Sequence, residues 1–284
     1  MAKRKAIDIL CNHFTPESIR KNVSENPEEA ARFEQVGVLS KVRELSPDAF
    51  MAHMDDIGIE YLLVPSIVTW SYWENHPVER TTVEEVTSLR KMYPKRIFGL
   101  YGVDPRTRMA GVRELEMCVR EHDFRGIHIH PHGFGHPPNH KYYFPFYAKC
   151  QELGIAVVVS MGHTLDLMPI ENGRPVHLDE VALYFPDLPI VITHTGWPWV
   201  EEAIAVAWKH PNVYIGTSAY KPRYWKPEMV HFLNSFGRGK VMWGSDFPLI
   251  QHQEALDQID ALKIRDEARR ALIYDTAAKV FKLP

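Results

Sequence analysis

The sequence predicts an α/β protein with the architecture of a (β/α)8 barrel, because strands and helices alternate along the whole chain. Eight short apolar runs of strand-like composition each end in a polar loop, and segments with helical spacing lie between them. Dividing 284 residues by eight gives about 35 residues per unit, which suits one strand, one helix and two loops. We therefore expect a single barrel domain over residues 1–284, with a doubly wound sheet as the alternative.

The eight apolar runs are the predicted strands of the barrel. They lie at residues 6–10, 60–64, 96–101, 126–130, 155–159, 189–193, 212–216 and 240–243. Between them, helix signals are visible. Residues 46–48 combine an N-cap serine with a first-turn proline, and residues 82–85 resemble a capping box. Residues 147–153 end at Gly154, a C-cap glycine, and residues 226–228 open a further helix.

Two connections are longer than ordinary loops, and both follow predicted strands. They cover residues 14–45 and 131–144. Long loops at the carboxyl ends of barrel strands usually build the active site, so we expect both to form walls of a pocket. Residues 14–45 and 170–176 are also candidate lids.

The composition favours small-molecule chemistry. With 33 basic and 36 acidic residues the formal net charge is −3, which gives no electrostatic reason to expect nucleic acid or an anionic membrane as a partner. Three cysteines do not make a disulfide framework, and no apolar run has the length of a membrane span. We therefore expect a cytoplasmic protein.

Residue types that bind metals or carry protons gather where the predicted strands end. These residues are Cys11 and His13 after the first strand, His128, His130 and His132 after the fourth, Ser160 and His163 after the fifth, His194 after the sixth and Asp246 after the eighth. Since the carboxyl ends of barrel strands meet at one face, such a set can converge on a metal or an acid–base site. Two-residue alternation would also point Cys11 and His13 the same way.

Each of these residues also has a structural interpretation. A single histidine at a strand end is more often a hydrogen-bonded core or surface residue than a ligand, and Cys11 alone is more often a small buried hydrophobe. Asp246 could cap the following helix, and Trp197 and Trp199 could serve packing alone. The convergence of several such groups, rather than any one of them, predicts a site.

Several segments in this order resemble the amidohydrolase-related TIM-barrel family, in the branch of aminocarboxymuconate semialdehyde decarboxylase and the resorcylate-type decarboxylases. They are residues 125–132 (RGIHIHPH), 147–154 (YAKCQELG), 162–164 (GHT), 194–199 (HTGWPW), 211–215 (PNVYI) and 243–248 (WGSDFP). The resemblance extends from the first strand to the C-terminal helix. It implies the same barrel fold.

The resemblance also implies a divalent metal, which we take to be zinc, held by Cys11, His13, His163 and Asp246, with His194 as the catalytic acid or base. Two positions depart from the family pattern. Cys11 stands where a His or Glu is usual, and Ser160 stands where the fifth strand normally ends in His. A serine hydroxyl is a poor ligand for a divalent ion, so the site recruits His163 or a strand-four histidine, or has lost the metal.

The function implied is that of a metal-dependent decarboxylase of a small aromatic or unsaturated carboxylic acid, working as a homodimer. His194 would deliver or position the proton, while Asp246 would complete the metal shell. Arg125, His128, His130, Trp197 and Trp199 are the expected substrate-binding residues, and His132 and Trp225 are further candidates. One alternative is a hydrolase of a lactone, ester or amide, with or without metal, in which Asp246 activates water. Another is a non-catalytic ligand-binding relative.

Overall fold

The computed structural model describes residues 4–72 and 75–284 and confirms the predicted barrel. In this part of the chain, eight parallel strands form one sheet whose order follows the chain: β1 (Ala6–Asp8), β2 (Ile59–Pro65), β5 (Ile97–Gly102), β6 (Gly126–Ile129), β7 (Ala156–Val159), β8 (Ile190–Ile192), β9 (Val213–Gly216) and β10 (Val241–Met242). Just beyond β1 and β10, the Ile9 amide donates to the Trp243 carbonyl at 3.3 Å, and Cys11 pairs with Phe247 in a parallel bridge. The sheet therefore closes on itself, which excludes the doubly wound alternative.

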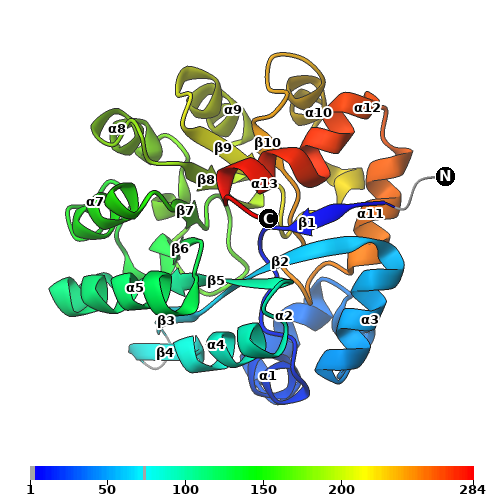
Figure 1. Cartoon of the computed structure of the whole chain (residues 1–284), viewed down its shortest axis with the longest axis horizontal. Coiled ribbons are helices and arrows are strands. Elements are labelled where there is room, and N and C mark those ends of the chain that lie inside the picture. Colours follow the sequence, from blue (N-terminus) through cyan, green and yellow to red (C-terminus); the bar gives the residue numbers. More distant parts are fainter. Residues whose placement is uncertain (1–3, 73–74) are drawn as a thin grey trace.

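Helices surround the strands (Figure 1). The larger ones in the described residues are α2 (Pro27–Gln35), α3 (Pro47–Ile57), α4 (Val83–Met92), α5 (Arg108–His122), α7 (Phe144–Leu153), α8 (His177–Tyr184), α9 (Val200–Lys209), α10 (Pro227–Asn234) and α11 (His252–Ala261). Shorter ones are α1 (Pro16–Ile19), α6 (Pro131–Phe134), α12 (Asp266–Arg270) and α13 (Thr276–Val280). Wider π-type turns at Arg20–Ser24 and Ala271–Asp275 continue α1 and α12, and 3-10 turns lie at Leu39–Lys41, Pro105–Thr107, Glu171–Gly173, His194–Gly196 and Pro222–Tyr224.

The helix signals in the sequence are confirmed. The Ser46 hydroxyl accepts from the Ala49 amide at 3.3 Å at the start of α3. Thr82 and Glu85 form a complete capping box before α4, with amide-to-side-chain bonds of 3.0 and 2.7 Å. Helix α7 ends at Gly154, which has φ +64°, a conformation that glycine adopts without a steric penalty.

The apolar residues form two layers, one on each face of the sheet. Alternate strand residues such as Leu63, Leu100 and Val158 fill the barrel interior, and Phe281, directly after α13, packs with them. The other strand residues pack outward against the helices. Two-residue alternation in β6 and β7 therefore directs His128 and Ser160 inward at the carboxyl end.

Two features above the carboxyl ends differ from the predicted loops. Residues 14–45 are largely helical, and they contain α1 and α2. An antiparallel ribbon of β3 (Ile67–Ser71) and β4 (His76–Thr81) follows β2 and was not predicted. Both features belong to the walls of the cavity described below.

No helix in the part of the chain that the structure describes is long and apolar enough to cross a membrane.

Candidate active site

A cavity of about 490 Å³ opens at the carboxyl ends of the strands, within the range of small-molecule sites. Its walls come from residues 14–45, the β3–β4 ribbon and the loops after β7, β8, β9 and β10. The polar residues among its lining are Asn12, His13, Ser18, Asn22, Glu29, Arg32, Thr69, Arg80, Thr81, His128, His130, His132, Ser160, His163, Thr164, Asp166, His194, Tyr220, Lys221, Tyr224 and Asp246. The predicted wall at residues 14–45 is thus confirmed, whereas the predicted wall at residues 131–144 supplies only His132.

Asp246 and His194 form a pair at the carboxyl ends of β10 and β8. His194 Nε2 lies 3.8 Å from Asp246 Oδ2, and this nitrogen is buried without a hydrogen-bond partner among the described residues. Asn12 Nδ2 donates to the other carboxyl oxygen, Oδ1, at 3.0 Å. Both members of the pair have left-handed backbones, with φ +56° at His194 and +57° at Asp246, a kind of strain that clusters at functional sites.

The surroundings of this pair set the protonation of both groups. Burial raises the pKa of Asp246 to about 7, against the opposing effect of the Asn12 hydrogen bond and with smaller contributions from Asp8 and Asp166. Burial lowers the pKa of His194 to about 4, although Asp166 and a hydrogen bond with the Met161 backbone act the other way. Near neutral pH, Asp246 is therefore populated in both its protonated and its ionised form, while His194 is a neutral imidazole.

Three further histidines line the cavity from the end of β6. His128 Nε2 lies 3.0 Å from the Ser160 hydroxyl, and burial lowers the pKa of His128 to about 3. His132 Nε2 donates to the Gly162 carbonyl at 2.8 Å, and burial lowers its pKa to about 4. His130 Nε2 lies 3.6 Å from Asp166 Oδ2. The imidazoles of His128 and His132 are therefore neutral at pH 7 and contribute no fixed positive charge.

A network of ion pairs joins the segments that form the cavity walls. Arg32 of α2 bonds to Asp166 of the loop after β7, and its Nη1 lies 2.7 Å from Glu29 Oε1. Arg80 of β4 reaches the same Glu29 oxygen at 2.6 Å. Burial would raise the pKa of Asp166, but His130, Arg32 and Arg80 hold it below its usual value. The network ties three separate segments of the cavity wall together.

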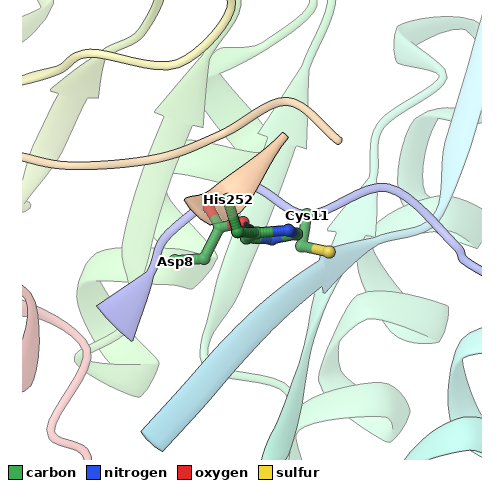
Figure 2. Close-up of side chains that lie close together, drawn as sticks. All are labelled: Asp8, Cys11 and His252. Carbon is green, nitrogen blue, oxygen red and sulfur yellow. Dashed lines mark hydrogen bonds and ion pairs between the residues drawn. The ribbon is translucent and has the colours of Figure 1, made fainter. Parts of the chain in front are cut away.

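The structure corrects the predicted position of Cys11. The Leu10 amide donates to Asp8 Oδ1 at 3.1 Å, and the regular alternation of β1 slips there: Ile7, Ile9 and Leu10 all join the interior layer. Cys11 consequently faces the helix layer, fully buried and outside the cavity. It lies beside Asp8 and His252 (Figure 2), while its neighbour Asn12 takes the place in the cavity.

His13 and His163 line the cavity but are not brought to Asp246 as a ligand set. His13 Nε2 lies 3.2 Å from the Glu85 carbonyl of α4, and Nδ1 lies 3.4 Å from the hydroxyl of Thr15, the N-cap of α1, so both ring nitrogens have partners. The His163 ring packs edge-on to Trp197, with centroids 5.5 Å apart.

Of the predicted substrate contacts, His128, His130 and Trp197 line the cavity and Arg125 and Trp199 do not. Arg125 precedes β6, so it lies at the amino-terminal end of the barrel, where it pairs with Asp123 at 2.8 Å. Trp199 lies under the Arg174 guanidinium instead. Trp225 is buried, with its indole N–H bonded to the Tyr220 carbonyl at 3.0 Å.

The second candidate lid, residues 170–176, does not line the cavity. Its Gly173 carbonyl accepts from the Gly162 amide at 2.6 Å. This segment therefore supports the loop after β7 from outside the cavity.

Sequence reasoning missed several polar residues of the site. Asn12 was passed over because the alternation was expected to favour its neighbours. Arg32 and Glu29 are spaced as an ordinary pair on a helix surface, which gives no sign that they meet Asp166 or Arg80. Asp8 is the signal that could have identified Asn12. Asp side chains commonly bond the backbone amide two residues on, and such a bond to Leu10 shifts the alternation so that Asn12 faces the cavity.

The donor set does not fit the metal site that the family resemblance implies. Within residues 4–72 and 75–284, Asp8, Cys11 and His252 are the one group of three metal-ligating side chains within 4.8 Å of one another, and this group lies outside the cavity. Asp246 and His194 are two donors, whereas catalytic zinc sites have three protein ligands. The predicted set of Cys11, His13, His163 and Asp246 is not assembled.

The chain belongs to the amidohydrolase family, whose model matches residues 45–283. Among curated proteins, it is 24% identical over 231 residues to 2-amino-3-carboxymuconate-6-semialdehyde decarboxylase from Dictyostelium discoideum. That match covers 68% of this chain and 64% of the relative, so the chain spans less than two thirds of the relative's length.

Solved structures share the fold along the whole chain. An uncharacterized TIM-barrel protein from Bordetella bronchiseptica has a TM-score of 0.79 and 22% identity, with 99% of each chain covered. A dihydroxybenzoic acid decarboxylase from Polaromonas sp. JS666, with bound manganese and the inhibitor 2-nitroresorcinol, has a TM-score of 0.71 and 18% identity, covering 99% of this chain and 97% of that chain. At these identities the likeness concerns the fold.

Proposed function

We propose that the protein is a decarboxylase of a small planar carboxylic acid, aromatic or unsaturated. The single observation that carries this proposal is the pair of Asp246 and His194 in the cavity, with their facing atoms 3.8 Å apart. The names of the Dictyostelium and Polaromonas relatives describe reactions of this class.

Decarboxylation replaces a carbon–carbon bond by a carbon–hydrogen bond, so it needs a proton donor. The substrate carboxylate leaves as carbon dioxide, its bonding electrons stay on the carbon, and a proton joins that carbon. Asp246, with a pKa raised to about 7 by burial, carries a transferable proton at neutral pH. The neutral His194, whose Nε2 lies 3.8 Å from Asp246 Oδ2, relays a replacement proton to the acid after each turnover.

The cavity walls suit a flat, partly apolar substrate. Trp197 and Tyr220, with ring centroids 5.6 Å apart, line the cavity together with apolar residues from α2 and the loop after β10. Aromatic side chains bind planar ligands through stacking or edge contacts. A volume of about 490 Å³ holds one substituted ring together with its polar groups.

The Polaromonas decarboxylase contains manganese, whereas in the described part of this chain no third metal-ligating side chain joins Asp246 and His194 in a close group. The reaction proposed for this chain assigns no step to a metal. Its proton transfer uses Asp246 and His194 alone.

Incubation with dihydroxybenzoates and with muconate-type acids, followed by measurement of carbon dioxide release, tests this function. We expect release from at least one acid, and a loss of about 100-fold or more in Asp246→Asn. His53→Gln, on the exposed face of α3, is the matched control and should keep the wild-type rate. Absence of release from every acid of both classes would contradict the proposal.

Hydrolysis of a lactone or ester is the second candidate, favoured by the same two atoms. A water molecule could donate to both Asp246 Oδ2 and His194 Nε2, and an ionised Asp246 would take its proton as the water attacks a carbonyl carbon. The two functions predict opposite pH dependence, because decarboxylation needs the protonated acid and hydrolysis the ionised one. Opening of a lactone with a rate that rises through pH 7 would support hydrolysis.

A further inference from the structure

The family resemblance places a cation beside Asp246, and the side chains around this position decide whether one can bind there. Ligand atoms must direct a lone pair at the ion. Polar side chains that line the cavity from the strand ends include Asn12 and His13 after β1, His128 at the end of β6, Ser160 after β7 and His194 after β8.

Asn12 presents a donor where a cation would need an acceptor. Its Nδ2 group donates to Asp246 Oδ1 at 3.0 Å. An N–H group and a metal ion compete for the same carboxylate lone pairs, so Asn12 satisfies the oxygen that a cation would otherwise neutralise. The amide also fixes the carboxyl group with its second oxygen toward His194.

Ser160 and His128 are engaged with each other. The hydroxyl and His128 Nε2 are 3.0 Å apart, and both side chains are buried. This pair fills the position at the end of β7 with a neutral hydrogen bond. His13 uses both of its ring nitrogens elsewhere, on the Glu85 carbonyl and the Thr15 hydroxyl.

The cluster of Asp8, Cys11 and His252 in Figure 2 does not replace the missing ligands. Asp8 Oδ1 accepts from the Ser245 amide at 2.8 Å as well as from Leu10, and Oδ2 accepts from His252 Nε2 at 2.9 Å and from the Ser245 hydroxyl. The carboxylate is therefore fully engaged in joining β1 to the end of β10. All three side chains lie behind the cavity wall, where an ion could not touch a substrate.

We infer that this site works without a bound metal, and that Asn12 is a positioning residue which holds Asp246 in the orientation that a cation would otherwise impose. Ser160, hydrogen-bonded to His128, occupies the place of the missing ligand. The catalytic part of this inference rests on the proposed function, but the metal-binding part does not.

Metal analysis of the purified full chain, together with calorimetric titration by manganese and zinc chloride, tests the inference independently of turnover. We expect substoichiometric metal and no one-to-one binding in the wild type. Ser160→His supplies a third ligand beside Asp246 and His194 and should strengthen zinc binding by about 10-fold or more. Carbon dioxide release should be unchanged after dialysis against a chelator.

One equivalent of tightly bound metal in the wild type that is lost in Asp246→Asn would overturn the inference. Equal zinc binding by the wild type and Ser160→His would overturn the role given to Ser160. If no acid is decarboxylated, the proposed function fails, whereas the metal content and the titrations still decide whether the site binds a metal.

Discussion

Asp246 Oδ2 and His194 Nε2 face each other across 3.8 Å at the carboxyl end of the barrel, and the Asn12 amide holds the far side of the carboxyl group. The two residues come from β-strand ends about 50 positions apart in the sequence. Their opposite pKa shifts, upward for the acid and downward for the imidazole, have the same principal cause, which is burial.

The rate of decarboxylation should fall as pH rises through about 7. The donor is protonated Asp246, whose pKa is raised to about 7, so kcat should drop about tenfold per pH unit above that value. A pH–rate profile from 5.5 to 9 measures it. A rate that increases across this range would indicate hydrolysis by the ionised acid.

Replacement of Asn12 by Ala should move this pH profile to higher values. The Asn12 hydrogen bond lowers the pKa of Asp246 because it stabilises the carboxylate, so its loss raises the pKa further. The measurement is the pH–rate profile of the variant, in which the fall in rate on the alkaline side should begin at a higher pH than in the wild type. Asn22→Ala is a matched control, since Asn22 also lines the cavity but bonds the Arg80 carbonyl. An unmoved limb in Asn12→Ala would contradict the positioning role.

Asp246→Asn should make the protein more stable at pH 8 than the wild type. An Asp with a raised folded-state pKa binds more protons when folded than when unfolded between about pH 4 and 7, so stability is lost as pH rises through that window. An asparagine removes this cost, which is on the order of 4 kcal/mol, and keeps the bond from Asn12. Urea unfolding at pH 8 and pH 5 measures it. The gain should shrink at pH 5, and Asp187→Asn on the surface should show no gain at either pH.

Arg32→Ala should loosen the wall formed by residues 14–45 while leaving the barrel intact. Arg32 is 8% exposed and bonds Glu29 and Asp166, so its removal leaves Asp166 without an arginine partner and Glu29 with Arg80 alone, at a cost of about 3 kcal/mol. Hydrogen exchange should show faster exchange in α2 with unchanged protection in β6 to β8. Arg20→Ala removes an exposed ion pair with Glu44, which solvent screens, and is the matched control. Equal exchange in both variants would contradict the role of the network.

The barrel could be predicted from the sequence because its evidence is repeated along the chain. All eight predicted strands are present, and His128 and Ser160, which the sequence marks at the ends of two of them, line the cavity. The pattern failed at Cys11, because one local bond from the Leu10 amide to Asp8 shifts the alternation after Ile9. Periodicity carries no sign of such a slip.

The ionic part of the cavity could not be predicted for another reason. Arg32, Arg80 and Asp166 lie far apart in the sequence and meet only because residues 14–45 and the β3–β4 ribbon fold over the barrel. Arg125 shows the converse. It stands next to a histidine-rich motif, but it precedes its strand and so lies at the opposite end of the barrel from the cavity.

The most direct test of the account is decarboxylation in deuterated water, with the product analysed by mass spectrometry and proton NMR. The account predicts carbon dioxide release with one deuterium at the carbon that lost the carboxylate. It also predicts that Asp246→Asn abolishes both signals while His53→Gln retains them. Carbon dioxide release and deuterium incorporation at the wild-type rate in Asp246→Asn would contradict the account, as would no release from any aromatic or muconate-type acid by the wild type.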